Sequence, residues 1–320
     1  MAVHAALVLA GLAVLLLAGD LLVRGAVNAS LKLGVPALLV GLTIVAFGTS
    51  APELIVSVNA VLRDAPGLAL GNVVGSNVAN ILLVLGVPAL IAGLQPWADR
   101  ETQRSFAIML AVSVLFIGVC FIGPVRWPHA LGLLAVLGFV LFDWWRSAQR
   151  HRDGPAGALV PEGADPALRW RGTALFLVVG LIGLPIGAEM LVRGSVAIAT
   201  ELGVSDAVIG LTIVAAGTSL PELATTLMAA RRREAGVALG NVIGSNIFNL
   251  LAIIGIAGLV GPLPVPEGML RVDLWVMLAA SLVLLPVIAG RAALSRIWGV
   301  GLTAAYAAYV TLLFLNGGLW

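Results

Sequence analysis

Long runs of apolar residues, separated by short polar segments, make up most of the chain. A helix needs ~20 apolar residues to cross the hydrocarbon layer of a membrane. Ten runs are long enough, and we place them near residues 3–27, 36–62, 68–94, 103–123, 126–146, 171–198, 204–230, 236–261, 272–290 and 295–317. The pattern therefore predicts an all-α polytopic membrane protein with ten transmembrane helices.

A single long polar connection interrupts this pattern between residues 147 and 170. It is rich in charged residues and proline, which is typical of a linker. We therefore predict a first five-span repeat at 1–146, a cytoplasmic linker at 147–170 and a second five-span repeat at 171–320.

Composition agrees with a membrane protein and excludes several other classes. Hydrophobic residues make up 60% of the chain and charged residues 11%, which is too apolar for one soluble core to hide. Cys120 is the only cysteine, so the sequence offers no disulfide framework and no thiolate metal cluster. The net charge of +2 gives no case for nucleic-acid binding, and we expect membrane lipid as the surrounding partner. No resident cofactor is expected.

The basic residues predict the orientation of the spans. With the amino terminus outside, only Arg63, Arg126, Arg193 and Arg271 fall in outer connections, so 18 minus four leaves 14 lysines and arginines inside. Cytoplasmic loops carry the excess of these residues, so both termini are predicted outside the plasma (inner) membrane. Because each half has an odd number of spans, five, the second half enters the membrane from the side opposite to the first. The two halves are predicted to form an inverted repeat, an arrangement that many secondary transporters share.

Two polar motifs inside the apolar runs are written twice. Residues 41–54 read GLTIVAFGTSAPEL and return as GLTIVAAGTSLPEL at 210–223, while GNVVGSNVAN at 71–80 returns as GNVIGSNIFN at 240–249. Each second copy lies 169 positions after the first, because 210 minus 41 and 240 minus 71 give the same offset. Ionisable groups within membrane spans are costly and usually functional. The duplicated stretches are therefore the candidate functional site.

Each copy gathers oxygen-bearing side chains on helix faces. Thr49 and Ser50 lie three or four residues before Glu53, so these side chains share one face. A second polar stripe recurs every four residues, at Asn72, Ser76 and Asn80. The second copy repeats both groups with Thr218, Ser219, Glu222, Asn241, Ser245 and Asn249. None of these faces is expected to meet lipid.

Proline is expected to break the helix beside each acid. Pro52 and Pro221 donate no backbone hydrogen bond and clash with the carbonyl four residues earlier, so a helix through Gly48 or Gly217 must bend or break there. Carbonyls freed within a membrane are tolerated only inside protein or along a cavity. We therefore expect broken helices at the midplane, with a bound cation as partner of the freed carbonyls.

The predicted ligands indicate which cation binds. Two carboxylates, several hydroxyls and amides, and loosened carbonyls form a set of hard oxygen ligands, which suits Ca²⁺, Mg²⁺ or Na⁺. A flexible cage of oxygens favours Ca²⁺ over Mg²⁺, which demands a stricter octahedron. Glu53 and Glu222 together carry a charge of −2 when ionised, which one Ca²⁺ or two Na⁺ would neutralise. An empty site would leave these charges unpaired in the membrane, so ion exchange is favoured over a passive channel.

The two copies resemble the alpha-repeats of the cation/calcium exchanger superfamily, and in particular its prokaryotic sodium/calcium exchanger-like antiporters. GTSAPE at 48–53 with GNVVGSN at 71–77 resembles the first alpha-repeat, and GTSLPE at 217–222 with GNVIGSN at 240–246 resembles the second. The resemblance implies a secondary active antiporter that exchanges Ca²⁺ for Na⁺ by alternating access. It also implies the ligands of those ions, namely Glu53, Glu222, Thr49, Thr218, Ser50, Ser219, Ser76, Ser245, Asn80, Asn249, Ala46 and Ala215.

The sequence departs from other branches of that superfamily in two ways. Asn80 and Asn249 stand where some members carry an aspartate, which argues against potassium co-transport. Ser76-Asn77 and Ser245-Asn246 stand where proton/calcium members typically have a glutamate, which favours Na⁺ over H⁺. An H⁺/Ca²⁺ antiporter of the same fold remains the alternative. An enzyme is not expected, because the motif serines have no histidine or lysine near them to act as a base.

Some polar residues also have simpler interpretations. Four glycines could serve only close helix packing, namely Gly71, Gly75, Gly240 and Gly244. Four asparagines could serve only to form hydrogen bonds between helices, namely Asn72, Asn77, Asn241 and Asn246. A further pair of equivalent acids, Asp20 and Glu189, is each followed four residues later by an arginine. We therefore predict the ion pairs Asp20–Arg24 and Glu189–Arg193 within their own helices.

Overall fold

The computed structural model describes residues 2–93, 99–152, 164–202 and 217–315. These residues are helical, with no strand among them, which confirms the predicted all-α class. The first half contains α1 (Ala2–Leu33), α2 (Ala37–Val40), the π-helix η1 (Gly41–Val45), α3 (Ala46–Thr49), α4 (Ala51–Leu62), α5 (Pro66–Leu82), α6 (Gly86–Ala92), α7 (Arg100–Ile122) and α8 (Trp127–Arg152). The second half contains α9 (Trp170–Glu201), α12 (Leu220–Arg231), α13 (Ala235–Phe248), the π-helix η3 (Asn249–Ile253), α14 (Ile254–Val260), the π-helix η4 (Met269–Asp273), α15 (Leu274–Val283), α16 (Leu285–Ile288) and α17 (Arg296–Leu315).

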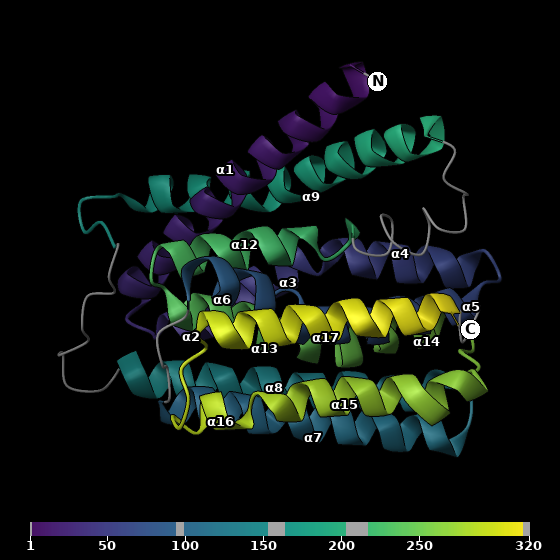
Figure 1. The fold of residues 1–320 in the computed structure, drawn as a ribbon. Coiled ribbons are helices and arrows are strands. Elements are labelled where there is room, and N and C mark those ends of the chain that lie inside the picture. Colours follow the sequence, from purple (N-terminus) through teal and green to yellow (C-terminus); the bar gives the residue numbers. More distant parts are fainter. Residues whose placement is uncertain (1, 94–98, 153–163, 203–216, 316–320) are drawn as a thin grey trace.

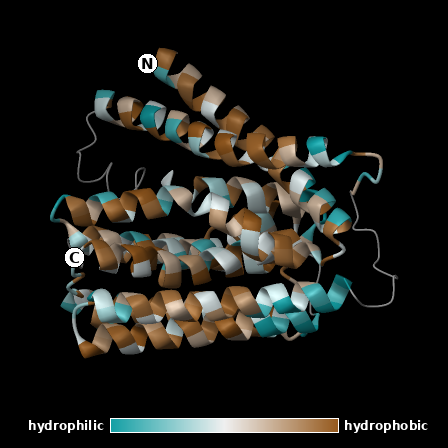
Figure 2. Cartoon of the chain, turned by 180° about the vertical axis from the view of Figure 1, so that it is seen from behind, coloured by the Kyte–Doolittle hydropathy of each residue, from teal (hydrophilic) through white to brown (hydrophobic). Residues whose placement is uncertain are grey.

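Several of these helices are long and apolar enough to cross a membrane. The described residues contain seven such spans, or eight when the bent pair Ala37–Thr49 and Ala51–Leu62 is counted as one. Figure 2 shows apolar residues along the helices and hydrophilic residues gathered toward their ends. The chain is therefore a multi-pass membrane protein. The number ten stays a prediction, since part of the expected span 204–230 lies outside the described residues.

Helices α1 and α9 form an obliquely crossing pair along one side of the molecule (Figure 1). Theirs is the most extensive contact between two helices in the described chain. They run antiparallel and approach through glycines: a Cβ atom on Gly11 would lie 2.6 Å from the Leu191 nitrogen, and one on Gly180 would lie 2.8 Å from the Leu22 nitrogen. Adding 169 to 11 and 22 gives 180 and 191, so the two contacts are reciprocal. Gly11 therefore contacts Leu191 in the same way that its equivalent, Gly180, contacts Leu22, which is the residue equivalent to Leu191.

Helix α13 lies at the centre of the fold, and all of its residues are buried. It belongs to the second half but packs against α2, η1 and α3 of the first half. A Cβ atom on Gly240 would lie 2.5 Å from the Leu38 carbonyl oxygen, and one on Gly244 would lie 2.5 Å from the Leu42 carbonyl oxygen. The packing role considered for these two glycines is thus present, and it fixes α13 directly against the first polar motif.

Because only the second-half glycine is in close contact, adding a methyl group should affect stability differently at the equivalent positions Gly244 and Gly75. We expect Gly244→Ala to lower the free energy of unfolding by about 1–3 kcal/mol, because backbone atoms would have to move apart. Gly75→Ala is the matched control, since 75 plus 169 is 244 and a Cβ atom on Gly75 meets nothing within 4 Å. Thermal unfolding of both variants in detergent would test this expectation. Equal effects at the two positions would contradict it.

The helix that carries the first motif is broken beside its proline, as predicted. Helix α3 ends at Thr49, Ser50 leaves the helical conformation with φ −84° and ψ 4°, and α4 begins at Ala51. The two segments meet at a bend of 42°. Ser219 has nearly the same conformation, with φ −87° and ψ 4°, immediately before α12. Each proline thus lies in the first turn of a new helix, where its missing N–H group costs nothing.

Candidate cation-binding site

The two acids of the motifs occupy equivalent helix starts. Glu53 lies in the first turn of α4 and Glu222 in the first turn of α12. Both side chains are buried, with 1% of each residue exposed. The amino-terminal end of a helix carries a partial positive charge, which stabilises a carboxylate placed there. The break beside each proline therefore creates a favourable position for a buried acid.

The two acids belong to one site. The Ser50 hydroxyl, three residues before Glu53, donates a hydrogen bond of 3.2 Å to Oε1 of Glu222. Thr49 also lies beside the Glu222 carboxyl, and Thr218 lies beside the Glu53 carboxyl. Hydroxyl groups of each half thus surround the acid of the other half. Two acids so close together repel each other when both are ionised.

Much of the polar surface at this site has no protein partner. Neither acid makes an ion pair with a basic side chain in the part of the chain that the structure describes. Buried side-chain oxygens without a hydrogen bond there include Glu53 Oε2, Glu222 Oε2, Asn80 Oδ1, Asn249 Oδ1, Thr218 Oγ1, Ser219 Oγ and Ser245 Oγ. Buried polar atoms without partners are costly and require an explanation. A cation bound by oxygen ligands would satisfy them.

The cation would rely on only two charged ligands. Among the described residues, no group of three or more histidine, cysteine, aspartate or glutamate side chains is arranged to hold a metal ion. Two carboxylates with neutral oxygens match the predicted ligand set. Such a set suits Ca²⁺ or Na⁺ better than a transition metal, which prefers imidazole or thiolate ligands.

Asn72 and Asn241 brace the two acids in the same way. Nδ2 of Asn72 donates to the Glu53 carbonyl at 3.2 Å and to the Ser57 hydroxyl at 3.0 Å. Nδ2 of Asn241 donates to the Glu222 carbonyl at 3.4 Å and to the Thr226 hydroxyl at 3.1 Å. These asparagines therefore connect neighbouring helices, which agrees with the simpler interpretation of their role. Ser57 and Thr226 are not among the predicted site residues, although each lies one helical turn after its acid.

Four more asparagines join the two halves by reciprocal hydrogen bonds. Asn80 Nδ2 donates to Asn246 Oδ1 at 3.1 Å, and Asn249 Nδ2 donates to Asn77 Oδ1 at 3.0 Å. All four side chains are buried. Asn80 and Asn249 donate through their nitrogens, and their oxygens accept no hydrogen bond from protein in the described region. Asn77 and Asn246 thus orient the two amides that are candidate ligands.

Of the remaining predicted residues, Ala46 and Thr49 lie directly before the helix break. The Ala46 carbonyl accepts the backbone N–H of Ser50 at 3.0 Å, and the Thr49 hydroxyl lies 3.3 Å from it. The same hydroxyl lies 3.1 Å from Oδ1 of Asn241, so it links the halves. Ser76 is buried in α5. Ala215 lies outside the described residues.

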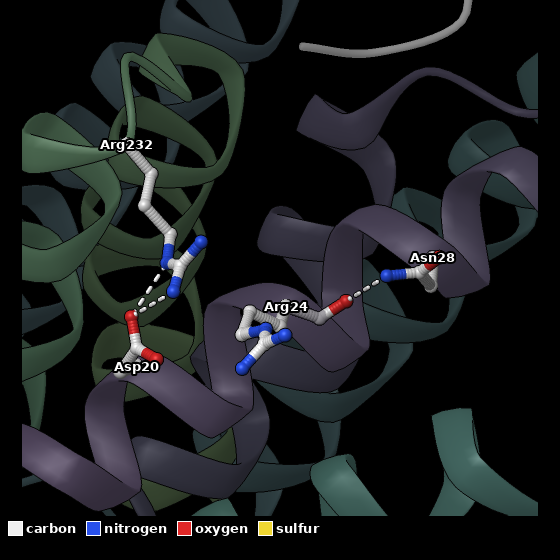
Figure 3. Close-up of polar contacts among 4 residues, drawn as sticks. All are labelled: Asp20, Arg24, Asn28 and Arg232. Carbon is white, nitrogen blue, oxygen red and sulfur yellow. Dashed lines mark hydrogen bonds and ion pairs between the residues drawn. The ribbon is translucent and has the colours of Figure 1, made fainter. Parts of the chain in front are cut away.

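One of the two predicted ion pairs within helices is wrong. Asp20 pairs with Arg232, which follows α12, at an Nη2 to Oδ1 distance of 2.5 Å (Figure 3). Arg24 instead lies over the ring of Phe176, 5.2 Å from its centroid. The other predicted pair, between Glu189 and Arg193, is confirmed.

Comparisons with known proteins agree with this geometry. The family model described as sodium/calcium exchanger protein matches residues 3–145 and again residues 172–315, one match in each half. CaxA of Alkalimonas amylolytica is 38% identical over 96% of this chain and 97% of its own. The sodium/calcium exchanger MaX1 of Methanosarcina acetivorans is 36% identical over the same shares. A structure of the sodium-calcium exchanger NCX_Mj, soaked with Na⁺ and Ca²⁺, matches with a TM-score of 0.81 and 32% identity over 97% of this chain and 98% of that one. The chain therefore belongs to the sodium/calcium exchanger protein family.

Proposed function

We propose that this chain is a secondary active antiporter that exchanges Ca²⁺ for Na⁺ across the membrane by alternating access. The observation that carries the proposal is the pair of buried acids, Glu53 and Glu222, which share one site and lack a basic partner in the described residues. Membership of the sodium/calcium exchanger family supports it, as do the relative and the solved structure that carry that name. Nothing in the site suggests catalysis.

The transported ions would bind to oxygen atoms of both halves. Glu53 and Glu222 would be the charged ligands common to Ca²⁺ and Na⁺, and Asn80 and Asn249 would offer amide oxygens that accept no hydrogen bond from the described protein. The remaining proposed ligands are the hydroxyls and carbonyls at Thr49, Thr218, Ser50, Ser219, Ser76, Ser245, Ala46 and Ala215. No cofactor is needed, because the ions are the cargo.

Charge balance explains why such a site would exchange ions. With both acids ionised, the empty site holds a charge of −2 in a buried environment, whereas one Ca²⁺ or two Na⁺ would neutralise it. Loaded forms would therefore reorient across the membrane more readily than the empty form. A third Na⁺ would leave a net positive complex, and exchange would then depend on membrane voltage.

We also propose that the fold is ten spans arranged as two inverted repeats, at 1–146 and 171–320, joined by a cytoplasmic linker at 147–170. The reciprocal contacts of Gly11 with Leu191 and of Gly180 with Leu22 support this arrangement, because a two-fold relation between the halves produces such pairs. The distribution of arginines supports an orientation with both termini outside, and we place the protein in the plasma (inner) membrane.

Flux measurements on proteoliposomes would test the proposed exchange. We expect uptake of ⁴⁵Ca²⁺ when Na⁺ is loaded inside and removed outside at fixed pH, and no dependence on K⁺. The driving gradients of Na⁺, K⁺ and H⁺ would be varied one at a time. Uptake that follows the pH gradient and ignores Na⁺ would support the H⁺/Ca²⁺ alternative and reject our proposal. Ca²⁺ conductance without any counter-ion would indicate a channel.

A further inference from the structure

Two tight turns at equivalent places carry equivalent arginines. Arg63 immediately follows α4 and Arg232 immediately follows α12, and 63 plus 169 is 232. The next residue adopts a left-handed conformation in both turns, with φ 58° at Asp64 and φ 60° at Arg233. The two arginines therefore leave turns of the same local shape, and any difference in their pairing arises from what surrounds them.

Asp20 and Glu189 are equivalent acids, but they form different ion pairs. The Asp20 carboxylate reaches across from α1 to Arg232, and the two side chains are 22% and 32% exposed. Figure 3 shows Asp20 facing Arg232. Glu189 instead pairs with Arg193 on its own helix, with both side chains more than half exposed. Arg63 is exposed and makes no ion pair within the described residues.

The helices that carry these ion pairs also pack differently in the two halves. Helix α1 packs along α12, where a Cβ atom on Gly19 would lie 3.1 Å from the Ala224 carbonyl oxygen. The equivalent helices, α9 and α4, are not in substantial contact. Ala224 is accordingly 6% exposed, whereas its equivalent Ile55 is 61% exposed. Helix α1 therefore covers α12 beside the turn that holds Arg232, whereas α9 does not cover α4 beside the turn that holds Arg63.

We propose that Asp20 and Arg232 form an ion-pair latch that keeps one side of the molecule closed, and that Glu189 and Arg63 form the reciprocal latch when the other side closes. This inference rests on the proposed antiport, which requires closure on alternate sides. Because α1 and α9 are packed together through their glycines, we expect them to shift as one unit. A shift that carries α1 away from α12 would bring α9 toward α4.

The residues next to Arg232 show that the contact is selective. Arg231 and Arg233 line a cavity of about 620 Å³ together with Gly93 and Ser295. Arg232 alone of these three arginines pairs with Asp20 in the described structure. Removing Arg231 therefore removes the same charge from the same turn and leaves the proposed latch intact. Arg231→Gln is the matched control.

Cysteine cross-linking would test the reciprocal pairing directly. The background variant is Cys120→Ser, and cysteines replace either Asp20 and Arg232 or Arg63 and Glu189. With a short bifunctional thiol reagent, we expect the first pair to link in resting protein and the second to link once Ca²⁺ and Na⁺ are supplied on opposite sides. Either link should stop exchange reversibly. If the Arg63–Glu189 pair never links, or its link leaves exchange unchanged, the proposal is wrong.

A second experiment weakens the Asp20–Arg232 ion pair and measures how often Arg63 and Glu189 come together. Asp20→Asn, placed in the Arg63–Glu189 cysteine variant, should raise the resting yield of that cross-link about twofold to fivefold, the range expected for losing a partly exposed ion pair. The double variant Asp20→Arg with Arg232→Asp should return the yield to its starting level, and Arg231→Gln should not change it. Equal effects of Asp20→Asn and Arg231→Gln would reject the latch. The Cys120→Ser background alone reports whether exchange occurs, so a failure of the proposed function is distinguished from a failure of the latch.

Discussion

Replacing Glu53 or Glu222 by glutamine is expected to abolish Ca²⁺ exchange while the protein still inserts and folds. Each substitution removes one of the two negative charges that share the buried site. Changes in the outer shell of a metal site already cost 10–100-fold in affinity, so losing a charged ligand should reduce exchange by about 100-fold or more. Gradient-driven ⁴⁵Ca²⁺ uptake at matched protein content would measure the loss.

Glu267→Gln is the control for this prediction, because Glu267 is an exposed acid that pairs with Arg271 on the surface. It should exchange at the rate of the unmodified protein. Normal exchange in either Glu53→Gln or Glu222→Gln would show that the transported ions bind elsewhere.

Asn77→Ala and Asn246→Ala should have the second largest effects, on both stability and transport. Removing Asn77 leaves the buried Nδ2 of Asn249 without its acceptor, and removing Asn246 does the same to Asn80. Leaving a buried polar group unsatisfied costs about 1–3 kcal/mol, and we expect a loss of unfolding free energy in that range for each variant. Exchange should also fall, because Asn80 and Asn249 are proposed ligands and would lose the hydrogen bonds that orient their amides.

Thermal unfolding and ⁴⁵Ca²⁺ uptake, measured on the same preparations, would test this second prediction. Asn59→Ala serves as the control, because Asn59 lies on the exposed face of α4. Both values measured for Asn59→Ala should match those of the unmodified protein. Unchanged stability in Asn77→Ala and Asn246→Ala would show that the reciprocal hydrogen bonds contribute nothing.

The sequence predicts local features well where one residue type determines the backbone. Pro52 lacks a backbone N–H and clashes with the carbonyl four residues earlier, and the helix breaks at Ser50, two residues before it. Pro185 has the same chemistry, yet α9 continues through it, so proline alone does not determine a break. The constant offset of 169 positions predicts which residues are equivalent. It does not predict that equivalent residues exchange partners, as Asn80 and Asn249 do with Asn246 and Asn77, because that depends on how the halves pack.

The ion pairs show why spacing alone is insufficient. Asp20–Arg24 and Glu189–Arg193 have the same spacing, yet only the second forms. Arg232 lies 212 positions from Asp20 and competes successfully for it, which no local pattern indicates. A helical spacing permits an ion pair but does not exclude a tertiary partner.

Other site features leave no mark in the sequence. Met277 and Met109 accept long hydrogen bonds of 3.7 Å and 3.6 Å from Asn77 and Asn246, although methionine in an apolar run normally predicts packing alone. Asn249 begins a π-helical turn that the apolar pattern does not distinguish from an α-helix. Such turns are frequent at functional sites, but they arise from packing rather than from a residue code.

Equilibrium binding of ⁴⁵Ca²⁺ to the purified protein tests most directly whether the two acids form one shared site. We expect a single bound Ca²⁺ per chain, displaced by Na⁺ with a sigmoidal dependence, and loss of binding in Glu53→Gln and in Glu222→Gln alike. Binding that survives in either single variant, or that Na⁺ does not displace, would contradict the shared site.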